Sequence, residues 1–451
     1  MIRCTRDGDV ALRAADPVEG LAGKAALYPY PRFSLAERDR RWRAVRRAMA
    51  ARGIDVVVCP NNTGNSTDFQ ANSRYLSHVG GGGDADIAVV FPLDGDITAF
   101  TTSAAPRWPT TQEWTKDVRE ARRRHGQVVV ERLRELKVDN ARIGIVGLGD
   151  DAGTRTPEGT VGYRFWKQIR DTFPKAELVD ATKLMAEIRY VKSEEEIAAL
   201  QMSMDIIEQG IAAEMEAARP DTMDWEVWAA AQYAMMRGGS EMPVHCNWLS
   251  GKNPRRTLTR PTRRIIERGD MIINELEASW IGYRSQAVQP VFVQVVDPVH
   301  AELIKVQREM FETLLPHLKP GLTVKDLSEL TAATGKKAAP SSGLAAGAVS
   351  SLTLHGRGAG DDGPIITDHA RDPAQLAVQL QGNMVFIFKP STTTSDRSHI
   401  CTWGDTVVVT PNGGRRLGKR PHELAVAGGK NEAAFRPAGY RPVLASSVEK
   451  V

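Results

Sequence analysis

The sequence contains few of the features that mark specialised classes of protein. Its 451 residues include only four cysteines and no C-x-x-C pair, which argues against a disulfide framework and a cysteine-rich zinc site. No stretch approaches the roughly 18 uninterrupted apolar residues of a membrane span. The first residues include Arg3, Arg6 and Asp7 without a following apolar segment. We therefore expect a cytoplasmic protein with reduced thiols and no membrane partner.

An excess of charge of one sign is also missing. The chain has 59 Lys and Arg against 55 Asp and Glu, for a net charge of +4. This is far from the clustered basic surface that nucleic-acid binding requires, so we expect no nucleic-acid partner. A hydrophobic fraction of 42% and a charged fraction of 25% are typical of a globular chain with two or three domains.

Alternating helix and strand patterns predict an N-terminal α/β domain. Residues 1–33 are rich in Gly, Ala, Pro and Arg without steady periodicity, and we expect them to form an arm. Ser34 is a plausible helix N-cap and Gly53 a helix stop. Short apolar strands and further helices follow, one of them expected through Trp114 to Leu136. We place this domain at residues 34–185.

A second domain begins at a clear helix start. Ser193 and Glu196 have the spacing of a capping box and precede a long apolar helical stretch. Later strand patterns, among them Met271 to Leu276, predict an α+β domain with strands gathered in a curved sheet. We place it at residues 186–421 and expect residues 422–451 to form a C-terminal tail.

Five segments beyond residue 188, taken in order, resemble the creatinase and aminopeptidase P family. They are R-x-x-K-S-x-x-E at 189–196, S-G-K-N at 250–253, Gly269-Asp270 with Gly282-Tyr283 after a strand, H-G-R-G at 355–358 with Asp361 and Pro364, and 382–390 followed by Asp405-Thr406. The resemblance implies an α+β pita-bread catalytic-type domain behind a smaller α/β domain that often helps to form a homodimer. Fold resemblance does not settle function.

The peptidase members of this family hold two divalent metals with two Asp, one His and two Glu. The matching positions are here Glu275, Gln286, His355, Lys389 and Gly404, so that only the histidine is retained. An ammonium about 4 Å from a dication is repelled by roughly 8 kcal/mol at an effective dielectric near 20. One carboxylate cannot offset that repulsion. We therefore predict no metal in this cavity and no cofactor.

One alternative keeps a single ion. Glu275, Glu277, His355 and Asp361 would form a rebuilt metal site if Asp361 or its neighbour Asp362 turned inward. This alternative would retain a metal-assisted hydrolase or lyase.

The resemblance to creatinase, a metal-free branch, is also partial. Its catalytic histidine and two glutamates correspond here to Leu258, Val288 and Lys389. The spacing from His355 to Pro364 is also similar to that of the dimethylsulfoniopropionate lyase branch. The resemblance therefore leaves hydrolysis and elimination both open.

The residues at the former metal position form a candidate acid/base set. We expect Lys389, His355, Glu275 and Gln286 on facing strands of one cavity. Lys389 would be an ion-pair partner or, once desolvated, a base, with Glu275 orienting it, His355 moving the proton and Gln286 hydrogen-bonding the substrate. The alternative is a structural Lys389–Glu275 salt bridge that fills an abandoned metal site. A dry cavity closed by this bridge would favour a binding protein, and an open polar pocket an enzyme.

Nearby residues are candidates for substrate binding. Glu277 follows Glu275 by two residues, so on a strand both side chains share a face. Arg357 could pair with Glu277 or bind a substrate carboxylate, or it could lie at the surface. Trp280 and Tyr283, like Trp248 and Trp403, could hold a cationic substrate through their rings or could be core residues. Asp361 completes the candidate set.

A cysteine nucleophile is a further possibility. The i, i+2 spacing of His399 and Cys401 makes them a better candidate pair than the adjacent His245 and Cys246. The other histidines, including His300, carry no constellation, and we expect them at the surface or in the core.

The sequence therefore favours a metal-independent creatinase-like hydrolase or lyase. It would act on a C–N bond of a small polar or cationic molecule, with the Lys/His/Glu set as catalyst. A non-catalytic pita-bread binding protein is the alternative.

Overall fold

The computed structural model describes two compact units. It covers residues 31–61, 70–80, 86–102, 112–149, 158–242, 246–254, 260–338, 347–360, 362–364, 366–367 and 373–443. The chain passes from the first unit to the second between Leu184 and Met185, one residue before the predicted boundary. In these ranges, no helix has both the length and the apolar composition needed to cross a bilayer.

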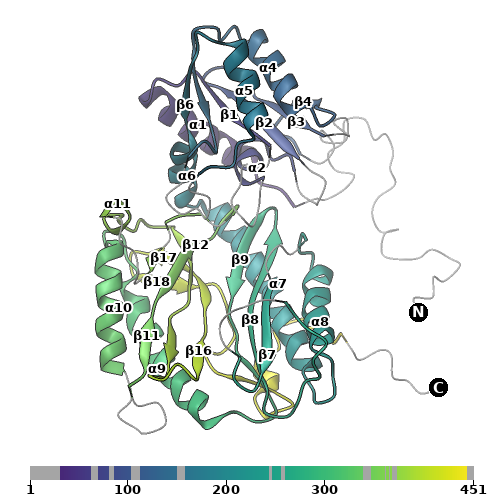
Figure 1. Ribbon diagram of the computed structural model, residues 1–451, viewed down its shortest axis with the longest axis vertical. Coiled ribbons are helices and arrows are strands. Elements are labelled where there is room, and N and C mark those ends of the chain that lie inside the picture. Colours follow the sequence, from purple (N-terminus) through teal and green to yellow (C-terminus); the bar gives the residue numbers. More distant parts are fainter. Residues whose placement is uncertain are drawn as a thin grey trace, which may run out of the picture. The chain divides into compact units, whose positions relative to one another are not determined.

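The first unit is built on a six-stranded sheet with the order β4-β3-β2-β1-β5-β6 (Figure 1). Its elements are α1 (Leu35–Ala51), β1 (Val56–Cys59), α2 (Ala71–Ser77), β2 (Ile87–Pro92), β3 (Thr98–Thr101), β4 (Asp117–Glu120), α4 (His125–Glu135), β5 (Arg142–Ile145), α5 (Tyr163–Thr172) and β6 (Glu177–Asp180). Apolar residues of β1, β2 and β5 are buried against α4 and α5. Ser34 caps α1 as predicted, because its hydroxyl accepts a hydrogen bond from the Glu37 N–H.

The predicted helix from Trp114 to Leu136 is wrong in its first half. Residues Asp117–Glu120 form β4, which pairs in parallel with β3. Arg122 and Arg123 then have φ values of 46° and 65°, which a right-handed helix cannot contain. The helix therefore begins only at His125.

The second unit contains the remaining elements. They are α6 (Thr182–Tyr190, which starts at the end of the first unit), α7 (Glu194–Ala217), α8 (Asp224–Arg237), β7 (Cys246–Gly251), β8 (Met271–Trp280), β9 (Tyr283–Ala287), β10 (Val291–Val293), α9 (Pro298–Leu314), η3 (Leu315–His317), α10 (Val324–Ala338), β11 (Val349–Ser351), β12 (Thr353–Gly356), β13 (Ile366–Thr367), α11 (Pro373–Leu376), β14 (Val385–Phe388), β15 (Ser391–Thr393), β16 (Ile400–Thr402), β17 (Asp405–Thr410), β18 (Gly413–Arg416), β19 (Ala425–Ala427) and η4 (Glu432–Phe435). The capping box of Ser193 and Glu196 starts α7 as predicted.

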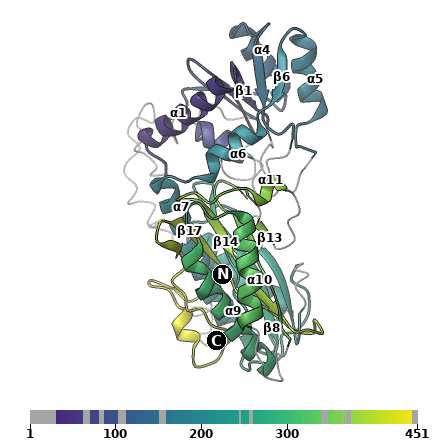
Figure 2. The same ribbon diagram turned by 90° about the vertical axis from the view of Figure 1, so that its left-hand side faces the viewer.

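The strands of this unit form three sheets. One has the order β19-β10-β8-β7 with β9 paired to β8, the second has the order β13-β12-β14-β17-β18, and the third is β11-β15-β16. Helices α7 and α8 pack together, with α7 against β8 and β9 (Figure 1). Helices α9 and α10 lie side by side (Figure 2). This layered α+β arrangement places the first two sheets between the helix pairs.

The segment from His422 onward is not the predicted tail up to Val443, where the described residues end. Strand β19 extends the first sheet by parallel pairing with β10. The His422 ring stacks on Trp403 with 3.8 Å between ring centroids, and its Nε2 lies 2.6 Å from Gln307 Oε1. The pairing joins segments more than 130 residues apart, which local sequence patterns do not reveal.

A buried acid without a cation lies between α7 and β8. Glu214 is fully buried and accepts hydrogen bonds of 2.9 and 2.7 Å from the Asn274 side-chain amide. Burial raises the pKa of Glu214 well above its ordinary value, and the nearby Asp224 carboxylate adds to the effect. The carboxyl group is therefore held in its protonated form over a wider pH range than in water.

Replacing Glu214 with glutamine tests the cost of this acid. Above about pH 4.5 the unfolded chain releases a proton that the folded chain keeps, so the free energy of unfolding falls as pH rises. We expect wild type to lose up to about 1.4 kcal/mol per pH unit until the raised pKa is reached. Urea unfolding between about pH 5 and pH 7 should show a smaller slope for Glu214→Gln. Equal slopes for the two proteins would contradict this account.

Candidate functional site

Three neighbouring strands place four polar side chains on one face of the first sheet. Glu275 and Glu277 lie two residues apart on β8, so their side chains point the same way. In the strand register Glu275 is opposite Asn247 on β7, and Glu277 is opposite Gln286 on β9. Asn274 has the opposite parity and points to Glu214 on α7. The face with the two glutamates is therefore the one directed away from that helix.

The second sheet supplies the cationic and imidazole groups. His355 lies on β12 opposite Ile387 of β14, and Arg357 follows it by two residues. Lys389 directly follows β14, and its backbone N–H donates to the Thr353 carbonyl at 3.3 Å. This register puts Lys389, His355 and Arg357 on the same face of the sheet. His355 is only 4% exposed.

Lys389 and Glu275 form a buried ion pair between the two sheets. The Lys389 ammonium lies 2.8 Å from Glu275 Oε1 and 3.5 Å from Gln286 Oε1. The second oxygen of Glu275 accepts a hydrogen bond of 3.2 Å from the Asn247 side chain. Lys389 and Glu275 are 4% and 7% exposed. The bridge named as the alternative in the sequence analysis is therefore formed.

Arg357 and Glu277 form a second buried ion pair. Arg357 Nη1 lies 3.1 Å from Glu277 Oε1, and Arg357 Nε donates to the Arg284 carbonyl at 3.2 Å. Arg357 is fully buried, so the alternative that it lies at the surface is wrong. The Gln286 amide joins the pairs, because its nitrogen donates to Glu277 Oε1 at 3.0 Å while its oxygen faces Lys389.

One oxygen of this cluster is left without a protein donor. Glu277 Oε2 is buried and has no hydrogen-bond partner among the described residues. An unsatisfied buried acceptor costs about 1–3 kcal/mol, so this atom is a place for the N–H or O–H group of a bound molecule or water.

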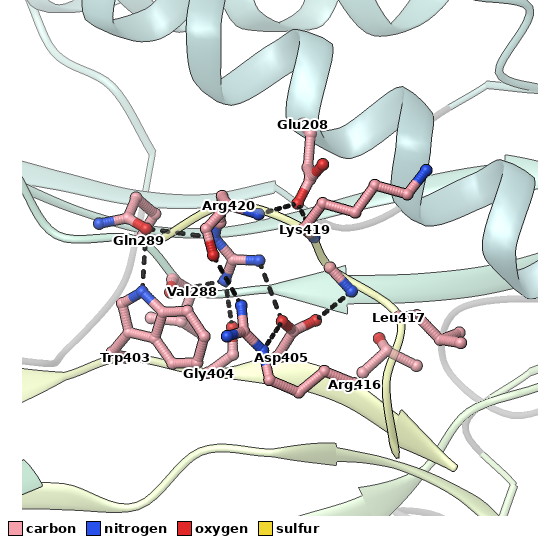
Figure 3. A network of polar contacts seen from close by, with 12 residues as sticks. Glu208, Val288, Gln289, Trp403, Gly404, Asp405, Arg416, Leu417, Lys419 and Arg420 are labelled. Atoms are coloured by element: carbon pink, nitrogen blue, oxygen red, sulfur yellow. Dashed lines mark hydrogen bonds and ion pairs between the residues drawn. The ribbon is translucent and has the colours of Figure 1, made fainter. Parts of the chain in front are cut away.

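Gly404 is the last of the positions that the family resemblance matched to a metal ligand. A Cβ atom there would lie 2.6 Å from Lys389 Cβ, so the chain packs too closely on residue 389 to admit a side chain at 404. The Gly404 carbonyl accepts a hydrogen bond from Arg420 Nη2, and Arg420 Nη1 lies 3.5 Å from Asp405 Oδ2 (Figure 3). Arg416 Nε donates to the same Asp405 oxygen at 2.8 Å. Burial lowers the pKa of Arg420.

Two members of this region were not predicted from the sequence. Asn247 lies shortly before the S-G-K-N segment, and the structure places it opposite Glu275. A predicted pairing of these two strands would have pointed to it. Arg420 follows the recognised Asp405-Thr406 strand by more than ten residues, and no local pattern placed it beside Gly404.

The H-G-R-G segment and the linker before α7 are cross-linked. Asp362 accepts hydrogen bonds from Arg189 Nη2 at 2.8 Å and from Lys192 Nζ at 2.9 Å, and all three side chains are buried. A Cβ at Gly356 would lie 1.9 Å from the Asp362 carbonyl oxygen, which explains a glycine there. Asp362 is thus committed to this cross-link. The predicted site residue Asp361 and the creatinase-matched Leu258 lie outside the described residues.

The predicted aromatic cage is wrong for Trp280 and Tyr283. Tyr283 donates its hydroxyl hydrogen to Glu196 on α7. Trp280 has the opposite parity to Glu275 and Glu277 on β8, and its ring lies near Gly239 after α8. Both rings are therefore on the helix side of the sheet.

The other two tryptophans of the predicted cage are structural. Trp248 is fully buried and donates to Asp224 at 2.6 Å. Trp403 faces cations of the chain itself, because the guanidinium groups of Arg420 and Arg416 lie 4.5 and 4.8 Å from its ring centroid.

The cysteine-nucleophile hypothesis is also contradicted. Burial raises the pKa of the Cys401 thiol strongly, and Cys401 is not exposed. Burial and the nearby Glu214 raise the pKa of Cys246 to about 12. Both side chains are neutral thiols near pH 7, whereas a cysteine nucleophile needs its thiolate form. His245 lies outside the described residues.

The donor set does not fit two divalent metals. Glu275 and Glu277 are paired with Lys389 and Arg357, and the positions of the other two carboxylates hold the lysine and a glycine. The rebuilt site is not formed either, because Glu275, Glu277 and His355 do not bring three ligand atoms within 4.8 Å of one another in the described part of the chain. The face offers instead two ion pairs, an imidazole and one unpaired carboxylate oxygen.

Fold and motif positions together define a two-domain protein of the pita-bread class. Residues 41–191 match the creatinase/prolidase N-terminal domain, and residues 198–411 match metallopeptidase family M24. The chain belongs to the creatinase/aminopeptidase P family, and the predicted combination of an α/β and an α+β pita-bread domain is confirmed.

Individual relatives are distant. The chain is 26% identical over 309 residues to the creatinase of Bacillus sp. (strain B-0618), covering 66% of this chain and 70% of that protein. It is 24% identical over 268 residues to the Xaa-Pro dipeptidase of Pyrococcus furiosus, covering 59% and 74%. The solved X-Pro aminopeptidase of Thermotoga maritima MSB8 is 18% identical, with a TM-score of 0.68 covering 85% of this chain and 99% of the other. That structure therefore supports the fold alone.

Removing the Lys389 cation should leave Glu275 as an uncompensated buried charge. We expect Lys389→Met to lower the free energy of unfolding by about 3–5 kcal/mol, because breaking a buried pair from one side is strongly destabilising. The double variant Lys389→Met/Glu275→Gln should recover most of this loss, since it removes both charges. Denaturant unfolding of Lys389→Met, Glu275→Gln and the double variant measures the coupling energy between the two side chains.

Lys419→Met is the matched control. Lys419 Nζ lies 2.9 Å from Asp205 Oδ1, close to the 2.8 Å between Lys389 and Glu275, but the Lys419 side chain is 71% exposed. Its loss should therefore lower the free energy of unfolding by less than about 1 kcal/mol. A Lys389→Met protein as stable as this control would refute the ion-pair account.

Proposed function

We propose that the protein is a metal-independent hydrolase that cleaves a C–N bond of a small polar or cationic molecule. The observation that carries the proposal is the buried Glu277 Oε2, which has no hydrogen-bond partner among the described residues and lies in the cluster that also holds the Lys389–Glu275 ion pair. Named relatives of the chain include a creatinase and Xaa-Pro dipeptidases, which supports a hydrolase on C–N bonds.

The ion pair supplies a fixed positive charge in a water-poor site. When water adds to the carbon of a C–N bond, negative charge develops on the oxygen attached to that carbon, and a preorganised cation stabilises it. Lys389 is the group with this role, and Glu275 with Asn247 keeps its ammonium oriented. Because Lys389 is held as an ion-pair partner, we assign it this electrostatic role and not that of the base.

His355 is the candidate base. A neutral imidazole takes a proton from the attacking water and returns it to the leaving nitrogen as the C–N bond breaks, so that water and substrate give an acid or carbonyl product and an amine. Gln286 holds the two ion pairs in register. Elimination of the amine would use the same base with a carbon-bound proton in place of water.

Glu277 gives the site its preference for a donor-rich ligand. Its Oε2 accepts nothing from the described residues, so a substrate N–H beside it would gain a charge-assisted hydrogen bond. Guanidino, amide and ammonium compounds carry such groups. Arg357 holds the other Glu277 oxygen and thereby fixes the direction of the free one.

A binding protein without catalysis is the second candidate. Both glutamates are already paired with cations of the chain, which favours a closed, structural cluster. A ligand that raises the thermal stability of the protein while no product forms would support this candidate. A cytoplasmic homodimer remains part of either proposal, and sedimentation would measure the oligomeric state.

Turnover of guanidino, amide and betaine compounds, followed by amine release, tests the enzyme proposal. We expect activity to persist in a chelator and to fall at least about 100-fold in His355→Gln and in Lys389→Met/Glu275→Gln, since each loses a group that acts in the transition state. Lys419→Met should keep wild-type activity. Circular dichroism confirms folding of each variant.

Full activity in the Lys389 double variant, or complete loss with chelator and recovery with a divalent metal, would overturn the proposed mechanism. Ligand binding with no turnover of any compound would favour the binding protein.

A further inference from the structure

Three potential metal ligands meet at the start of α9, on residues that the proposed chemistry does not use. Asp297 is the N-cap of α9, His300 lies in its first turn, and His399 directly precedes β16. One ligand atom of each lies within 4.8 Å of the other two, the only such group of three in the described ranges. His300 Nδ1 is 3.9 Å from Asp297 Oδ1, and His399 Nε2 is 3.9 Å from Asp297 Oδ2.

His300 presents a buried nitrogen with no partner. The residue is 1% exposed, and its Nδ1 has no hydrogen-bond partner among the described residues. Nδ1 lies 3.9 Å from Asp297 Oδ1, so the nitrogen without a partner faces the cluster. An imidazole nitrogen that carries no proton offers a lone pair to a metal ion.

Charge and hydrogen bonding prepare the other two ligands in the same way. Ser398 Oγ donates to Asp396 at 2.8 Å and lies 2.7 Å from His399 Nδ1, so it accepts a hydrogen bond from Nδ1–H. His399 Nε2 then has no proton, and its lone pair points toward Asp297. Asp297 Oδ1 accepts from the Val299 N–H at 2.7 Å, and Oδ2 is left for the cluster.

We propose that Asp297, His300 and His399 bind one divalent transition-metal ion of the zinc type. Two imidazoles and a carboxylate form a common three-ligand set for zinc, with water as the fourth ligand. Asp297 and His399 have side chains that are 35% and 16% exposed, which leaves a path for the ion and the water.

Ligand distances of about 2.0–2.2 Å place donors roughly 3.4 Å apart around a tetrahedral ion, so each side chain moves inward by less than about 1 Å. The positive end of the α9 dipole opposes a cation, and the Asp297 carboxylate offsets it.

An ion here would join the start of α9 to the start of β16, about a hundred residues further along the chain. The role would be structural, because the ion would tie the start of α9 to β16, which already pack together through Leu303 and Cys401.

Titration of metal-free protein with Zn²⁺ and with Co²⁺ tests the site. We expect one ion per chain, visible absorption bands typical of tetrahedral Co²⁺, and a rise in melting temperature of about 5 °C at saturating Zn²⁺. His399→Gln and Asp297→Asn should weaken binding at least about 100-fold. Asp297→Asn retains an oxygen that can accept the hydrogen bond from the Val299 N–H. It therefore removes the negative charge of the ligand without removing the helix cap. His317→Gln, at an exposed histidine of η3, is the matched control and should bind like wild type.

No stoichiometric binding by wild type would overturn the proposal. So would unchanged binding by His399→Gln, or binding that is lost only in His355→Gln, which would place the ion in the Lys389 cluster. This comparison also separates the two proposals. An ion bound at Asp297 does not affect the metal-independent chemistry proposed for Lys389, which only the activity assays can refute.

Discussion

Pairing of buried carboxylates with cations of the chain is the constraint on which the centre of the second unit depends. Carboxylates in a water-poor interior must be matched, because an isolated buried charge costs far more than a domain's stability margin. Here the cations come from the chain, with Lys389 on Glu275, Arg357 on Glu277, and Arg420 with Arg416 on Asp405. Ammonium and guanidinium groups of the chain thus balance these carboxylates.

Strand register, and not charge, determines where these side chains lie. Glu277 and Gln286 lie opposite each other because β8 and β9 pair at that register, whatever their chemistry. At Gly404 the chain packs closely on residue 389, since a Cβ at 404 would lie 2.6 Å from Lys389 Cβ. A side chain at 404 would therefore require the backbone to move.

Residue spacing within short segments predicted the elements that depend on neighbours in the sequence. The capping box of α7, the strand of Glu275 and the Lys389–Glu275 pairing follow from spacing and family motifs. The side of the sheet taken by Trp280 was also accessible, because its even parity on β8 separates it from Glu275. Parallel pairing of β19 with β10, and the meeting of His300 with His399, depend on contacts across more than 90 residues. Such contacts leave no periodicity in one sequence, and so the tail was wrongly predicted and the meeting of His300 with His399 was not predicted.

The difference between a structural plug and a working site lies in one oxygen. A cluster whose only role is to neutralise charge gains by satisfying every polar atom, since each unsatisfied one costs about 1–3 kcal/mol. Glu275 is held at both oxygens, by Lys389 and Asn247. Glu277 is held at one, and its other oxygen is buried without a donor in the described part of the chain. This asymmetry is costly in a plug and useful in a site that receives a donor from outside, and it is the strongest physical reason to favour a ligand there.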